Sequence, residues 1–182
     1  MRGYFAIGME GLSKPGNFGT LKRSAHAFNA AFAFTVNAHI RKFGEDYSDT
    51  AHSDAQIPVY EFENAEKLLL PKGCQLVGIE LTDEAIELPS FRHPPQAAYV
   101  LGPERGSLSP TMLERCAHIV KIPTKFCINV GQAGVIVMYD RIVSLGRHAP
   151  RPVRPGGPTE PLPDHVRGGP QYWDDDNNPV MG

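Results

Sequence analysis

The apolar positions in the first part of the chain follow two different periods. Residues 4–9 form a short apolar run, which is typical of a buried strand. After a loop, four apolar residues recur at the spacing of one helix face: Phe18, Leu21, Ala25 and Phe28. Ala33–Val36 is again a short apolar run. This order of strand, loop, helix and strand predicts a βαβ unit, whose two strands lie parallel in one sheet.

The alternation continues along the chain. Short apolar runs predict four further strands, at Ile57–Phe62, Gln75–Leu81, Ala97–Leu101 and His118–Ile122. Ser109 followed by Pro110 is a favourable helix start and predicts a short helix up to Cys116. Asn129–Leu145 predicts a long apolar helix, and the polar segment Phe43–Gln56 predicts a loop or an irregular helix. Strands alternating with helices predict an α/β fold with a parallel sheet.

The apolar pattern ends near Gly146. Residues 147–182 hold 8 of the 17 prolines and show neither a helical nor a strand period. We therefore expect one folded domain over residues 1–146 and a disordered tail over 147–182. The aromatic pair Tyr172–Trp173 is the exception in this tail, because such side chains can dock on a surface.

Composition excludes several classes of protein. No run approaches 18 apolar residues, and the first residues lack the apolar core of a signal peptide, so we expect a cytoplasmic protein. The three cysteines are odd in number and lack C-x-x-C spacing, which argues against a disulfide scaffold and a zinc site.

The formal net charge is −2, yet residues 11–44 contain no acid and several Lys and Arg. This basic segment favours a polyanionic partner.

Three loops have residue patterns that suit a ligand, although each has a purely structural alternative. Lys14 to Arg23 is a glycine-rich turn that opens the first predicted helix, where backbone N–H groups suit an anion, but its glycines could simply form a turn. In Tyr99 to Ser109 a strand runs into a loop with two glycines, where ligands approach the backbone of open α/β sheets, but it could be an ordinary connection. Ile122 to Val130 joins a strand to the long helix, and Asn129 could be only its cap.

Together the three loops are more specific than any one of them. The order N-x-G-x-x-x-R, L-G-P-E-R-G-S-L-S and I-P…I-N-V before an apolar helix resembles the three motifs of the SpoU (TrmH-type) branch of the SPOUT RNA methyltransferases. The resemblance spans Tyr4 to Arg147. It implies a parallel-sheet SPOUT domain with a C-terminal trefoil knot that works as a homodimer. The implied reaction is methyl transfer from S-adenosylmethionine to a ribose 2′-hydroxyl of RNA, with tRNA expected ahead of rRNA, and neither DNA nor a membrane as partner.

The resemblance also assigns residues. Those matching catalytic positions are Arg23, Asn17, Glu104 and Asn129. Those matching cofactor-binding positions are Gly102, Ile122, Ile128 and Ile79. Arg23 is expected to act near the cofactor of the partner subunit, as a general base or as a group that binds phosphate and stabilises the alkoxide. The remaining basic residues of the acid-free segment are candidates for RNA phosphate contacts: Lys14, Lys22, Arg41 and Lys42.

Two departures from the family pattern keep an alternative open. The third motif usually has Ser-Leu-Asn, whereas this chain has Cys127–Ile128–Asn129, and a thiol is a weaker hydrogen-bond donor than a hydroxyl. The loop Pro123–Cys127 is also short for the family. The alternative is a catalytically inactive RNA-binding or assembly protein with the same fold, and a small-molecule α/β enzyme is a third possibility.

Overall fold

The structure, a computed structural model, divides the chain into two compact units, Met1–Gly146 and Arg147–Gly182. It describes residues 3–38, 57–146, 148–149, 151–152, 155–157, 172–173 and 179–180. In the second unit, β8 (Tyr172–Trp173) pairs antiparallel with β9 (Pro179–Val180), a strand pair that the apolar pattern did not predict. The predicted loop Phe43–Gln56 lies outside the described residues.

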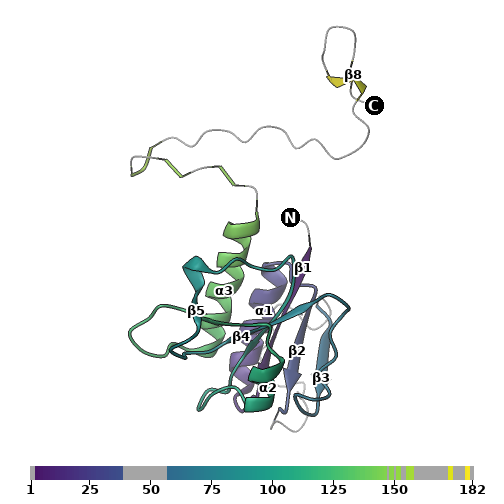
Figure 1. The fold of residues 1–182 in the computed structure, drawn as a ribbon, viewed down its shortest axis with the longest axis vertical. Helices are drawn as coiled ribbons and strands as arrows, with labels where there is room; N and C mark the ends of the chain where they lie inside the picture. Colours follow the sequence, from purple (N-terminus) through teal and green to yellow (C-terminus); the bar gives the residue numbers. More distant parts are fainter. Residues whose placement is uncertain are drawn as a thin grey trace. The chain divides into compact units, whose positions relative to one another are not determined.

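The first unit is built around a seven-stranded sheet with the strand order β3-β2-β1-β6-β4-β7-β5, in which every strand pair is parallel. The strands are β1 (Tyr4–Glu10), β2 (Phe32–Val36), β3 (Val59–Phe62), β4 (Gln75–Ile79), β5 (Ile86–Glu87), β6 (Gln96–Leu101) and β7 (His118–Lys121). The helices are α1 (Pro15–Ala27), α2 (Pro110–Arg115), α3 (Val130–Leu145) and the 3₁₀ helix η2 (Leu88–Ser90) (Figure 1). The predicted parallel α/β architecture is confirmed.

The predicted βαβ unit is present as β1, α1 and β2, with Ala6 opposite Phe32 in the parallel register. The cap of α2 also follows the sequence, because the Ser109 side chain accepts a hydrogen bond from the backbone N–H of Met112. The pattern did not predict β5 or η2. Each is only two or three residues long, which is too short to show a period.

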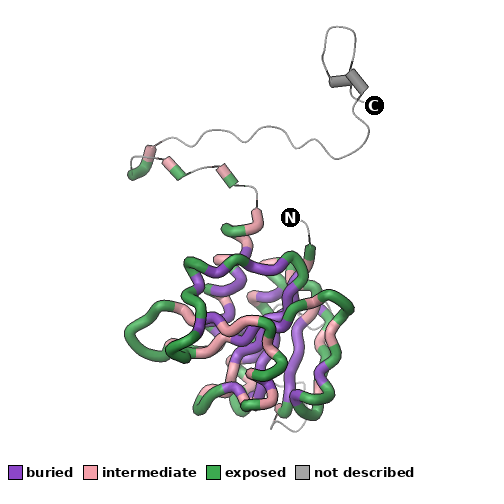
Figure 2. Tube along the Cα trace, in the orientation of Figure 1, coloured by how far each residue is buried: buried purple, intermediate pink, exposed green. Residues whose placement is uncertain are grey.

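The sheet has an apolar core on each face. Along β1, Phe5, Ile7 and Met9 point to the face covered by α1 and α3, whereas Ala6 packs with Phe34 and Val100 on the opposite face. The second face is covered by α2 and by residues 65–70. Figure 2 shows the buried residues concentrated in the central strands and in the inner sides of the helices.

Helices α1 and α3 lie side by side on one face of the sheet (Figure 1). They approach closely at Gly134, where an added Cβ atom would lie 2.2 Å from Leu21 Cδ1 and 3.3 Å from Ile7 Cδ1. Leu21 and Ile7 are fully buried, so neither side chain has open space to move into. Gly134 therefore sets the distance between the start of α3 and the middle of α1.

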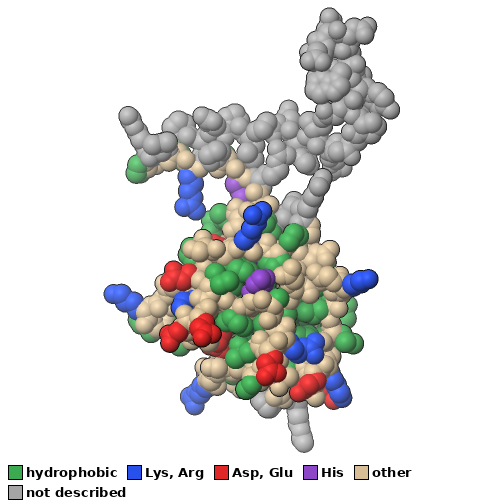
Figure 3. Space-filling model, in the orientation of Figure 1, with side chains coloured by type: hydrophobic (Ala, Val, Ile, Leu, Met, Phe, Trp, Pro, Cys, Tyr) green, Lys and Arg blue, Asp and Glu red, His purple; other side chains and the backbone are tan. Residues whose placement is uncertain are grey.

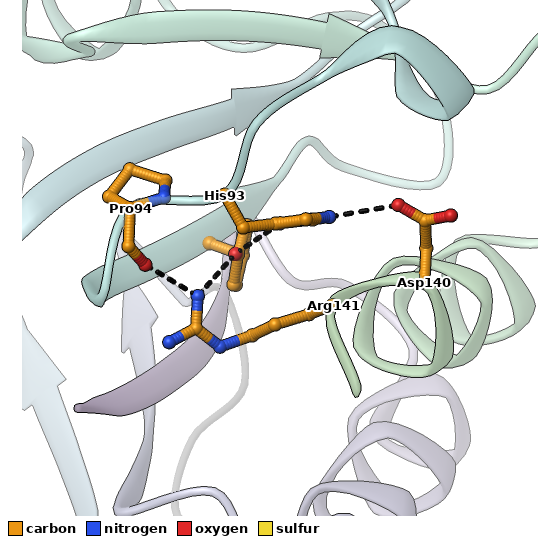
Figure 4. A network of polar contacts seen from close by, with 5 residues as sticks. His93, Pro94, Asp140 and Arg141 are labelled. Atoms are coloured by element: carbon orange, nitrogen blue, oxygen red, sulfur yellow. Dashed lines mark hydrogen bonds and ion pairs between the residues drawn. The ribbon is translucent and has the colours of Figure 1, made fainter. Parts of the chain in front are cut away.

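A buried arginine joins α3 to the amino ends of β1 and β6 (Figure 4). Arg141 has no exposed surface, and it donates hydrogen bonds to the backbone carbonyls of Pro94 at 2.6 Å, Pro95 at 2.8 Å and Tyr4 at 3.2 Å. It also donates to the Tyr99 hydroxyl at 3.1 Å. These bonds stabilise a charge that would otherwise be costly to bury.

The hydrogen bonds around Arg141 also define the tautomer of a buried histidine. Because Arg141 donates to the Tyr99 oxygen, the Tyr99 hydroxyl is free to donate to His93 Nδ1, 2.6 Å away. His93 Nε2 then carries the ring proton and donates to Asp140 Oδ2 at 2.9 Å. Burial lowers the pKa of His93 below its usual value, although Asp140 acts in the opposite direction.

Among the described residues, no helix has both the length and the apolar character that crossing a membrane requires.

Candidate active site

The amino end of α3 is tied to the first helix by an asparagine pair. The Asn129 Oδ1 atom caps α3 by accepting from the backbone N–H groups of Gly131 at 2.9 Å and Gln132 at 3.3 Å. Its Nδ2 group donates to Asn17 Oδ1 at 3.1 Å. Asn129 is therefore a helix cap, and it is also one member of a contact between two of the predicted motifs.

Glu104 extends this contact to the second motif. The Asn17 Nδ2 group donates to Glu104 Oε1 at 3.0 Å, the same oxygen accepts the Lys14 backbone N–H at 3.0 Å, and the Ser13 hydroxyl donates to Oε2 at 2.7 Å. Partial burial by itself raises the pKa of this carboxyl, but hydrogen bonds from Ser13, Asn17 and Lys14 outweigh burial and hold the pKa below its usual value. These hydrogen bonds thus hold the ionised Glu104 carboxylate in place. Glu104, Asn17 and Asn129 form one hydrogen-bonded chain.

A cavity of about 340 Å³ opens at the carboxyl ends of β4, β6 and β7, next to this chain. All four residues predicted to bind a cofactor line it: Ile79, Gly102, Ile122 and Ile128. Asn17, Glu104 and Asn129 also line it, so the fold brings seven of the eight residues predicted as catalytic or cofactor-binding to one place. The carboxyl ends of parallel strands are where open α/β sheets bind ligands.

The predicted basic residues do not gather in the same way. Lys14 lines the cavity and is exposed. Lys22 is half-buried on α1, and Arg41 and Lys42 lie outside the described residues. On the face drawn in Figure 3, basic and acidic side chains are interspersed.

Arg23 is separate from the other three predicted catalytic residues. Its side chain is exposed on α1 and does not line the cavity. No hydrogen bond or ion pair joins it to Asn17, Glu104 or Asn129 in the part of the chain that the structure describes. Within one chain, the site therefore has the cavity and the hydrogen-bonded residues Glu104, Asn17 and Asn129, but it lacks the predicted arginine.

Comparison of the sequence with known protein families identifies the family of this chain. The sequence profile of the SpoU rRNA methylase family matches residues 4–139. The chain belongs to the SpoU rRNA methylase family. A search of curated proteins gives no match.

Several solved structures share this fold. An rRNA methyltransferase from Sinorhizobium meliloti superposes with a TM-score of 0.71 at 21% identity, over 79% of this chain and 57% of that one. The A. aeolicus TrmH/SpoU tRNA modifying enzyme gives 0.69 at 20% identity, over 77% of this chain and 74% of its own. A protein from a study of the 2-OH methylation of C/U34 on tRNA gives 0.68 at 16% identity, over 80% of this chain and 92% of that one.

Sequence reasoning missed two charged residues that line this cavity, Glu80 and Lys121. Glu80 directly follows β4 and lines the cavity beside Ile79. An acidic residue at the carboxyl end of a predicted strand was a signal that could have found it. Cys127, which stands where the family usually has serine, also lines the cavity and is exposed, and all three cysteines of the chain are free thiols.

Proposed function

We propose that this chain transfers a methyl group from S-adenosylmethionine to a ribose 2′-hydroxyl of RNA. The observation that carries the proposal is the cavity that residues of all three motifs line together, with Asn17, Glu104 and Asn129 joined by hydrogen bonds at its edge. Family membership supports the same chemistry.

The cavity suits an adenosyl cofactor in size and lining. Its volume falls within the range of small-molecule sites, about 300–1,000 Å³. Ile79, Ile122 and Ile128 offer apolar surface for a flat base, while the backbone is open at Gly102. A Cβ atom at Gly102 would lie 3.2 Å from the Leu108 nitrogen and 3.6 Å from Glu80 Oε2, so a side chain here would crowd the cavity wall beside Glu80. These residues would hold the cofactor.

The protein's task in this reaction is to align the two reactants. The chemistry supplied by bound S-adenosylmethionine is a methyl group on positively charged sulfur. The cofactor would supply this methyl carbon to the ribose oxygen, with S-adenosylhomocysteine as the leaving group and the hydroxyl proton passing to solvent. Asn17 and Asn129 position the loops at the cavity edge. Arg23 binds an RNA phosphate and stabilises the developing alkoxide, because a guanidinium gives up its proton only with great difficulty.

A symmetric dimer would complete the site. Three exposed apolar side chains follow one another along α3: Ile136, Tyr139 and Val143. On the adjacent α1, Gly16 and Gly19 face open space. A second copy covering these helices would bury the apolar stripe and bring its Arg23 towards the cavity, which accounts for the distance of Arg23 from its own site.

The trefoil knot belongs to this proposal as well. Contacts between α3 and the segment that precedes β6 support it, because Arg141 and Asp140 bond to Pro94, Pro95 and His93. A chain end that passes beneath this segment would form such contacts.

We favour tRNA as substrate, since the relative matched over 92% of its own length comes from a study of tRNA methylation. The cytoplasmic location and the disordered tail stay predictions.

A labelling experiment tests the function directly. The protein is incubated with methyl-labelled S-adenosylmethionine and either tRNA or rRNA, and the digested RNA is analysed by mass spectrometry. We expect a 2′-O-methylated nucleoside from tRNA, and none from the Gly102→Val variant, whose side chain would crowd the Leu108 backbone and Glu80 at the cavity wall. A methylated base would contradict the proposed position. RNA binding without any methylation would favour the inactive RNA-binding alternative.

A further inference from the structure

Glu80 is held in a fixed orientation on the cavity wall. Its backbone N–H donates to the Val120 carbonyl at 3.0 Å, next to the end of β4. Its carboxylate accepts two backbone N–H groups, one per oxygen: Leu81 donates to Oε1 at 2.9 Å and Leu108 donates to Oε2 at 2.8 Å. The side chain is half-buried. Two backbone donors fix the carboxylate before any ligand arrives, which lowers the entropy cost of binding.

The Glu80 carboxylate retains free acceptor capacity. A carboxylate offers about four lone-pair positions, two on each oxygen, and the two backbone bonds use only one on each. Glu104, by comparison, already accepts hydrogen bonds from Ser13, Lys14 and Asn17. The Lys121 ammonium is bonded to backbone carbonyls at Thr82 and Asp83, and no ion pair joins it to Glu80 in the described part of the chain.

The position of Glu80 indicates which end of a ligand it meets. Asn17 follows β1, Glu80 follows β4, and β6 lies between these two strands in the sheet. Strands are about 4.8 Å apart, so β4 and β1 are separated by roughly 10 Å. In the proposed reaction the methyl group lies on the Asn17 and Asn129 side. The nucleoside part of the cofactor therefore lies on the Glu80 side, next to Gly102, where an added Cβ atom would lie 3.6 Å from Glu80 Oε2.

We propose that Glu80 binds the two vicinal ribose hydroxyls of the adenosyl cofactor, one on each carboxylate oxygen. This assignment rests on the proposed function. Two hydroxyl donors side by side match one spare acceptor on each oxygen of a fixed carboxylate. A site built to bind a hydroxyl rejects an analogue that lacks it, because the carboxylate oxygen then loses that hydrogen bond. Glu80 is thus a specificity residue for a ribose, as opposed to a deoxyribose, nucleoside.

Calorimetry tests this assignment without any turnover. S-Adenosylhomocysteine and its 2′-deoxy analogue are titrated into the wild type, Glu80→Gln, and the matched control Glu84→Gln, whose side chain is exposed and outside the cavity. A hydrogen bond to a charged group corresponds to a preference of about 10- to 100-fold, so we expect this preference for the ribose form in wild type and control. In Glu80→Gln it should shrink to within a few-fold. The melting temperature should fall slightly, because the amide NH₂ group cannot accept the backbone N–H that one carboxylate oxygen accepts.

Three results would overturn the assignment. The first is equal affinity of the wild type for both ligands, a measurement that needs no variant. The second is full discrimination in Glu80→Gln. The third is a Glu80→Gln variant that binds S-adenosylhomocysteine more weakly but binds 5′-methylthioadenosine, which keeps the ribose and lacks the amino acid, as well as the wild type does. This result would place Glu80 at the ammonium group instead. Failure of the wild type to bind S-adenosylhomocysteine at all would contradict the proposed function itself.

Discussion

Cys127 shows how the surroundings of a single residue control its chemistry. The three free thiols differ in environment: Cys127 is exposed at the cavity, whereas Cys74 and Cys116 are half-buried. Burial raises the pKa of Cys116 to about 12 and also raises the pKa of Cys74. Because the thiolate is the reactive form, the two half-buried cysteines are poor nucleophiles at neutral pH.

We therefore expect iodoacetamide at pH 8 to label Cys127 well before Cys74 and Cys116. Peptide mass spectrometry over time measures the order. Saturating S-adenosylhomocysteine should slow the labelling of Cys127 at least several-fold, because Cys127 lines the cavity. Equal labelling of all three cysteines would contradict the environments described, and labelling of Cys127 unaffected by ligand would separate this residue from the binding site.

His93 gives a pH dependence of stability with a defined sign. Its pKa in the folded protein lies below its usual value of about 6.5, mainly because of burial. Below pH 6.5 the unfolded chain therefore binds more protons at this residue than the folded one, and the free energy of unfolding falls as the pH is lowered. Above pH 6.5 both states are neutral at this residue and the effect vanishes.

Urea unfolding at pH 7.5 and 5.5 measures the effect of His93. The wild type should lose more stability between these two pH values than His93→Gln, whose amide can still bond to Tyr99 and Asp140 but does not titrate. Other titrating groups are common to both proteins and cancel in the comparison. The same loss in both proteins would show that His93 contributes nothing to the pH dependence.

At the scale of elements, the packing of α3 on α1 depends on the small size of Gly134. Alanine is a better helix former than glycine by about 1 kcal/mol, so Gly→Ala at an exposed helical site stabilises. At Gly134 the new methyl group would overlap the buried side chain of Leu21, and overpacking costs about 1–3 kcal/mol. We expect Gly134→Ala to lower the free energy of unfolding by about 1 kcal/mol, the net of these two effects.

The matched control is Ser144→Ala, on an exposed position of the same helix. Its free energy of unfolding should stay the same or rise slightly, since alanine has the higher helix propensity. Urea unfolding of both variants tests the pair. An increase in stability for Gly134→Ala would show that α3 and α1 can separate at little cost.

The elements that the sequence predicted correctly are those with a local signal. The 3.6-residue spacing of Phe18, Leu21 and Ala25 predicted α1, and Ser109–Pro110 predicted the start of α2. The order of strands in the sheet has no such signal. Nothing local places β6 between β1 and β4, and the Arg141 bonds to Pro94 and Pro95 join residues 46 or more positions apart. The resemblance to a family supplied the site residues that spacing alone left open.

At the scale of the whole molecule, the proposed site shared between two subunits makes a clear prediction. We consider a heterodimer with one Arg23→Ala subunit and one Gly102→Val subunit, isolated by two different affinity tags. The Arg23→Ala subunit keeps its cavity and receives Arg23 from the partner subunit. One of two sites is then complete, so about half of the wild-type activity should return, although each parent homodimer is inactive.

An inactive heterodimer would show instead that Arg23 serves the cavity of its own chain. The control is a heterodimer of wild type with Gly102→Val, which should have about half of the activity in either arrangement. Light scattering on Tyr139→Glu, which places a charge in the exposed stripe of α3, tests the dimer separately. A monomeric Tyr139→Glu protein and a dimeric wild type are expected.

The hydrogen-bonded chain from Glu104 through Asn17 to Asn129 has a consequence for synthesis on the ribosome. Asn17 is synthesised 112 positions before Asn129. At a translation rate of 5–20 residues per second, roughly ten seconds pass between the synthesis of Asn17 and that of Asn129. During that interval the apolar face of α1 has no α3 to cover it. The nascent chain thus passes through a stage with an exposed helix face, and this face is where we expect a chaperone to bind before the enzyme can form.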